Sequence, residues 1–186
     1  TTLCALASLR AEFAATSLLV APLAGLLTDR LLQEEDELEP WVLANLFWAL
    51  TAIPMEEDRL SALLRLLMRQ TLRRADDLDG QATCLILWSI AMMQRRAVEE
   101  GTVAEYETSE LLPALLSRVR RTADSMTPNE LSSVVWAMGA LAAGVSDAGS
   151  VLTETRVELA CALDGAGLPE MSLALWGLAR LDHRDV

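Results

Sequence analysis

One short apolar pattern recurs four times along the chain and limits its fold more than any other feature. Each copy has a large apolar residue directly before a tryptophan and a small residue directly after it. Aliphatic residues stand two and five positions after the tryptophan. The copies occupy residues 43–53, 83–93, 131–141 and 171–181 and contain Trp48, Trp88, Trp136 and Trp176. Successive tryptophans are 40, 48 and 40 residues apart. Such a period is typical of arrays of helical units that bury their apolar faces against their neighbours.

The repeat predicts an all-α fold, a right-handed α-solenoid of stacked helix hairpins of about 40 residues each. We expect a single array over residues 1–186 that is a module of a longer protein. Its expected units are a partial repeat at 1–32, full repeats at 36–76, 77–124 and 127–164, and a half repeat at 167–186. The second full repeat is longer because of an expected loop inserted at 97–109.

Local signals place the helices inside these units. The first full repeat is expected to contain helices at 39–53 and 56–74, separated by Pro54. The sequence Thr-Pro-Asn-Glu at 127–130 is a capping-box pattern that predicts a helix start. One helix is expected at 150–163, and the last helix is expected to end near Leu181. No stretch alternates apolar and polar residues in the way that predicts strands.

Composition restricts the partners that the chain can have. Hydrophobic residues make up 52% of the sequence, which fits helices buried on more than one face. The longest uncharged runs reach 16 residues, short of the roughly 18 to 20 needed to span a bilayer. We therefore expect no membrane insertion. The net charge of −12 opposes broad binding to nucleic acid, because phosphate binding needs positive surface charge.

The sequence offers little material for catalysis or metal binding. Cys4, Cys84 and Cys161 are widely spaced within apolar helical patterns, and we expect them to be reduced, buried thiols. The single histidine, His183, lies in a charged terminal segment and lacks a nucleophile nearby in the sequence. We expect no catalytic residues, cofactor, metal or small-molecule substrate.

Arginine and tryptophan side chains are the candidates for RNA contact. Arg65, Arg69 and Arg73 recur every four residues on one expected helix face, and Arg118 and Arg121 occupy similar late positions on a later helix. Stacked units could align these five arginines into one ridge. The alternative interpretation is that they compensate helix dipoles and pair with acids. The four repeat tryptophans are expected to pack between helices. Trp41 lies outside the repeat register and is a candidate exposed contact residue.

Two motif copies carry a resemblance to a known family. Leu-Ala-Asn-Leu-Phe-Trp-Ala-Leu at 43–50 and Glu-Leu-Ser-Ser-Val-Val-Trp-Ala-Met at 130–138 resemble the octotricopeptide repeat. This helix-pair repeat is related to those found beside RAP and FAST-kinase-like domains. The resemblance implies an organellar array that acts in RNA maturation, stability or translation. It also implies that a structural role in a divergent mitochondrial ribosome is possible.

The resemblance and the residues together lead to two functional hypotheses. The first is a non-enzymatic, RNA-associated structural component of a ribonucleoprotein, such as a divergent mitochondrial ribosome. It would contact ribosomal RNA or an organellar transcript, together with neighbouring proteins. The alternative is a protein-only scaffold or assembly factor in another large organellar complex. The resemblance implies a mitochondrial location, with the chloroplast as the alternative.

Overall fold

The computed structural model describes residues 22, 25–26, 28–31, 33, 37–53, 57–99, 110–141, 148–154 and 156–182, and the regular structure in these ranges is entirely helical. The all-α class expected from the repeat is therefore observed. The α-helices are α3 (Pro40–Ala52), α4 (Glu57–Arg73), α5 (Gly80–Glu99), α6 (Leu111–Thr122), α7 (Pro128–Leu141), α8 (Ala148–Glu154), α9 (Arg156–Asp164) and α10 (Leu168–Asp182). Two short 3-10 helices, η2 (Ala75–Asp77) and η3 (Ala123–Ser125), follow α4 and α6.

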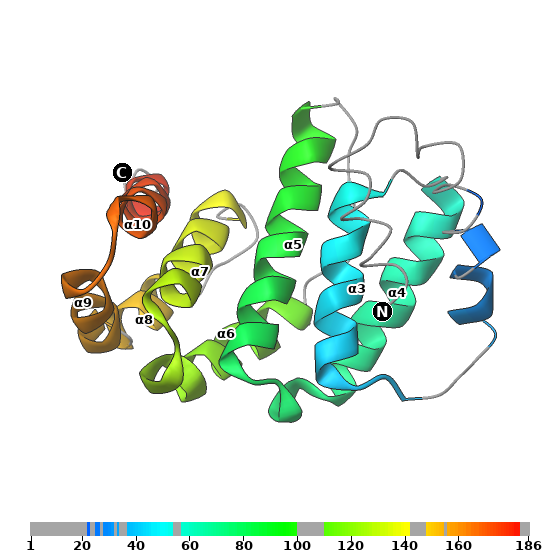
Figure 1. Cartoon of the computed structure of the whole chain (residues 1–186), viewed down its shortest axis with the longest axis horizontal. Helices are drawn as coiled ribbons and strands as arrows, with labels where there is room; N and C mark the ends of the chain where they lie inside the picture. Colours follow the sequence, from blue (N-terminus) through cyan, green and yellow to red (C-terminus); the bar gives the residue numbers. More distant parts are fainter. Residues whose placement is uncertain are drawn as a thin grey trace.

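The helices that carry the repeat tryptophans lie next to one another in chain order. Helix α3 contacts α5, α5 contacts α7, and α7 contacts α10, as the row in Figure 1 shows. The intervening helices form a second layer, in which α4 contacts α6 and α6 contacts α8. Helices α3, α5 and α7 also contact a helix of the second layer that follows each in the chain, namely α4, α6 and α9 respectively. The core lies between these two layers.

The repeat pattern explains why the tryptophan helices pack closely. In α3, α5 and α7 the large residue before the tryptophan is almost fully buried, and these residues are Phe47, Leu87 and Val135. The small residue after the tryptophan is completely buried in the same three helices, and these residues are Ala49, Ser89 and Ala137. A small side chain at a crossing point lets neighbouring helix axes approach, while the large residue fills the adjacent space.

The start of α7 contains the capping box that its sequence predicts. The Glu130 carboxylate accepts hydrogen bonds from the Thr127 backbone nitrogen at 2.7 Å and from the Thr127 hydroxyl at 2.9 Å. The Glu130 backbone nitrogen donates in turn to the Thr127 hydroxyl at 3.3 Å. These reciprocal bonds satisfy backbone donors that the first helical turn leaves unpaired.

Replacement of Thr127 by alanine is expected to lower the free energy of unfolding by about 1 kcal/mol, because α7 loses its side-chain cap. Urea unfolding followed by circular dichroism measures this change. Thr127→Ser keeps the hydroxyl and is the matched control, with an expected loss of less than half as much. An equal loss in both variants would show that the methyl group and not the cap matters.

One helix boundary differs from the sequence-based expectation. Helix α5 continues to Glu99, into the range expected to be a loop, and Arg95 and Glu99 form an ion pair at 2.9 Å across its last turn. The range 150–163, expected to be helical, is helical at every described residue and falls in α8 and α9. The two short helices pack on different neighbours, α8 on α6 and α9 on α7.

Candidate nucleic-acid interface

Three arginines form an exposed row on α4, here called the α4 arginine stripe: Arg65, Arg69 and Arg73. Successive members are four residues apart, which corresponds to a rise of about 6 Å along the helix. The opposite face of α4 is anchored in the core by completely or almost completely buried leucines, including Leu63 and Leu67. Burial of that face fixes the rotation of α4 and keeps the stripe at the surface.

The α4 arginine stripe has free guanidinium groups within the described structure. None of its three members forms an ion pair or hydrogen bond with another described residue. The acids at the start of α4, Glu57 and Asp58, lie at the other end of the helix. A row of unpaired cations at regular spacing can contact successive anionic groups of an extended ligand.

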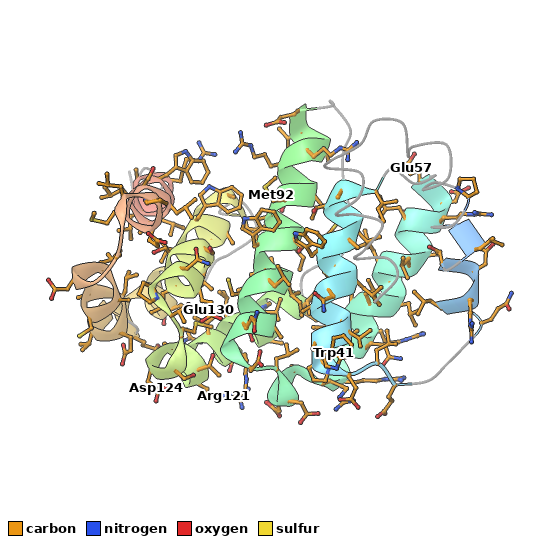
Figure 2. The ribbon with its side chains drawn as sticks, viewed as in Figure 1. Trp41, Glu57, Met92, Arg121, Asp124 and Glu130 are labelled. Atoms are coloured by element: carbon orange, nitrogen blue, oxygen red, sulfur yellow. The ribbon has the colours of Figure 1, made fainter. Side chains whose placement is uncertain are left out.

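The two α6 candidates have partners inside the chain. The Arg118 guanidinium donates to the backbone carbonyl of Leu78. Arg121 lies 2.6 Å from the carboxylate of Asp76, and Figure 2 shows Arg121 at the edge of the molecule near Asp124. The hydrogen bond and the positive charge of Arg121 hold the pKa of Asp76 below its usual value. Of the five candidate arginines, the three of the α4 arginine stripe therefore have no described partner, whereas Arg118 and Arg121 have one each.

The role of Arg118 recurs in the preceding unit. Arg74 donates to the carbonyl of Leu38 at 3.4 Å, and Arg118 donates to that of Leu78. Each acceptor stands two residues before the first residue of a tryptophan helix. Arg118 lies within α6 and Arg74 directly follows α4, so each arginine ties the second helix of its unit to the start of the first helix. The sequence pattern did not indicate this contact of Arg74. Arg74 also forms ion pairs with Glu39 and Asp77.

Three of the four repeat tryptophans form a row of ring contacts across the helices. The Trp88 and Trp136 rings are 6.4 Å apart, and the Trp136 and Trp176 rings are stacked at 5.7 Å. Arg180 lies over the Trp176 ring at 5.8 Å. Such offset ring pairs add to the energy of apolar burial. Trp41 is 58% exposed and stands at the first turn of α3, apart from the row (Figure 2).

The cysteines differ from the expectation that all three are buried. Cys84 is buried in α5, and desolvation raises the pKa of its thiol to about 12. Cys161 is exposed, because it lies on a face of α9 that no described helix covers. Cys4 and His183 lie outside the described residues.

The exposure difference predicts a difference in thiol reactivity. In a Cys4→Ser background at pH 8, we expect Cys161 to react rapidly with a disulfide reagent and Cys84 to react only on unfolding. The raised pKa of Cys84 also predicts a stability loss above the ordinary thiol pKa, since only the unfolded chain ionises there. Removal of Cys161 should abolish the rapid phase. A rapid phase that persists in the Cys161→Ser variant would contradict the burial of Cys84.

Other classes of site find no support in the described ranges. No three His, Cys, Asp or Glu side chains within them are grouped so that they could hold a metal ion. No helix in the part of the chain that the structure describes has the length and apolarity to cross a membrane. No protein-family model, curated protein or solved structure matches the chain significantly.

Proposed function

We propose that this chain is a non-enzymatic, RNA-associated structural component of an organellar ribonucleoprotein, such as a divergent mitochondrial ribosome. In this proposal the two helix layers form a right-handed α-solenoid of octotricopeptide-like units. The observation that supports RNA contact best is the α4 arginine stripe, Arg65, Arg69 and Arg73, which is exposed and unpaired among the described residues. The organellar location rests on the resemblance of the repeat motif.

The proposed mechanism uses shape and local charge. Guanidinium groups at a regular spacing contact phosphate oxygens, and such contacts position RNA without reading its sequence. The buried core holds α4 rigid, so the arginines lose little freedom other than that of their own side chains on binding. The overall charge of −12 does not prevent this contact, because the field near the stripe and not the total charge governs it.

The test is equilibrium binding of a labelled single-stranded RNA to the chain at low salt, followed by fluorescence anisotropy. Replacement of Arg65, Arg69 and Arg73 together by glutamate is expected to weaken binding by more than about tenfold. The matched control replaces Arg95, Arg96 and Arg180, which are also exposed, by glutamate and changes the total charge equally. An equal loss in both variants would show a general charge effect and would contradict a site on α4.

A protein-only scaffold is the second candidate, and a specific observation favours it. Arg118 and Arg121 are used for contacts within the chain, and acidic Asp76 stands beside Arg121. Positive and negative side chains thus lie side by side on that surface, which suits protein partners better than phosphates. The same binding experiment separates the candidates, because a scaffold that contacts only proteins would leave the labelled RNA unbound even at low salt.

A further inference from the structure

Carboxylates, and not further cations, lie in line with the α4 arginine stripe at the start of the helix. Ala62 and Asp58 stand three and seven residues before Arg65, and this spacing places both on the same side of α4 as the stripe. Asp58 is exposed, and so is neighbouring Glu57 (Figure 2). Asp58 lies about 10 Å from Arg65 along the helix axis. An RNA strand that continued along α4 in this direction would meet two carboxylates, which repel its phosphates.

Beyond the other end of the stripe, the nearby guanidinium groups are already engaged. Arg74, the residue directly after the stripe, pairs with Asp77 at 3.1 Å and with Glu39 at 3.7 Å. Arg121 of α6 pairs with Asp76 at 2.6 Å. The side chains of Asp76 and Asp77 are 82% and 59% exposed, so their charges face the solvent next to the end of α4. A phosphate at this end would have to compete with carboxylates that the chain itself holds there.

The stripe does not continue sideways onto α6, the helix of the second layer that α4 contacts. Arg74 and Arg118 donate to corresponding backbone carbonyls, so positions 44 residues apart are equivalent in the two units. By this correspondence, the last two members of the stripe are replaced on α6 by Pro113 and Ser117, which are exposed and uncharged. On these sides the stripe is therefore an isolated group of three cations that extends over about 12 Å of α4.

We propose that the α4 arginine stripe binds three successive phosphates of a single RNA strand, and that the strand turns away from α4 beyond them. This inference rests on the proposed function and specifies the segment of RNA that the site accepts. Each guanidinium group contacts one phosphate, and such contacts carry no sequence information. The chain thus holds RNA at one short segment of its backbone and does not guide a strand along the array of helices.

A short site has a consequence for the way in which binding depends on RNA length. A tetranucleotide has three internucleotide phosphates and fills the site, whereas a dodecanucleotide adds phosphates that find no cation. The longer RNA can bind in more registers, which raises its affinity but leaves the number of neutralised phosphates unchanged. The salt dependence of the association constant reports that number, so both RNAs should give the same slope of about −2.

The test measures binding of the labelled tetranucleotide and dodecanucleotide to the full chain by fluorescence anisotropy at several salt concentrations. We expect the two slopes to agree. A slope for the dodecanucleotide that is twice that for the tetranucleotide, or steeper, would overturn the short site and leave the proposed function intact. Absence of binding by both RNAs at low salt would instead contradict the proposed function itself.

A variant that lengthens the stripe tests whether the carboxylates close the site. Asp58→Arg places a fourth cation in line with the stripe, and circular dichroism verifies that the variant is folded. We expect its slope for the dodecanucleotide to steepen to about −3 and its slope for the tetranucleotide to stay near −2. Asp164→Arg, at an exposed acid in α9, changes the total charge equally and should alter neither slope. An unchanged slope in Asp58→Arg, or an equal change in Asp164→Arg, would overturn the proposal.

Discussion

Replacement of Gly177 by alanine is expected to lower the free energy of unfolding by about 2 kcal/mol, as overpacking of a tight core does. Helix propensity alone predicts the opposite sign, because alanine in a helix interior is about 1 kcal/mol more favourable than glycine. The added methyl group has no room, since it would meet the carbonyl group of Val135 and the backbone nitrogen of Trp136. Helices α7 and α10 must separate to admit it. Urea unfolding measures the sign directly.

Gly165 provides a matched control for this prediction. A Cβ atom at Gly165 would have no neighbour within 4 Å. Gly165→Ala is therefore expected to be neutral or to stabilise the chain by a few tenths of a kcal/mol, because it restricts the unfolded state. A Gly177→Ala variant as stable as Gly165→Ala would contradict the close crossing of α7 and α10.

The second large effect is expected at Trp136. This side chain is 7% exposed and contacts the rings of both Trp88 and Trp176. Trp136→Ala removes a large buried side chain and both ring contacts, so we expect the free energy of unfolding to fall by about 3 to 5 kcal/mol. The midpoint of thermal unfolding, followed by circular dichroism, should fall accordingly.

Trp41 is the matched control for Trp136, because it is a tryptophan in a helix of the same layer but is 58% exposed. Trp41→Ala is expected to change the free energy of unfolding by less than about 1 kcal/mol. Trp176→Ala should lie between the two, because that ring is 39% exposed and contacts one tryptophan. Similar losses of unfolding free energy at Trp136, Trp176 and Trp41 would contradict the expectation that the loss increases with burial of the ring.

Helix positions could be predicted from the sequence because their signals are local. The tryptophan pattern indicated the helices observed as α3, α5, α7 and α10, and the Thr127–Glu130 capping box marked the start of α7 to the residue. The neighbours on which α8 and α9 pack could not be predicted in this way. Helix α8 packs on α6 and α9 packs on α7, and such tertiary preference leaves no periodic signal in the sequence.

In the candidate interface, too, features within one helix could be predicted from the sequence, whereas contacts between helices could not. The spacing of Arg65, Arg69 and Arg73 on one helix determined that they share a face, and the buried leucines opposite determined that this face is outside. The partner of Arg118 is 40 residues away and that of Arg121 is 45 residues away. Only the stacking of the helices brings these groups together, so spacing alone could not distinguish an arginine used internally from a free one.

The salt dependence of RNA binding tests the central claim most directly. Three arginine–phosphate contacts on a single strand predict that the logarithm of the association constant falls with the logarithm of salt concentration with a slope of about −2. Replacement of Arg65, Arg69 and Arg73 by glutamate should remove this dependence together with most of the binding, and the Arg95, Arg96 and Arg180 control should keep it. A slope that the α4 variant leaves unchanged, or no RNA binding by the wild-type chain at low salt, would contradict phosphate contact by the α4 arginine stripe.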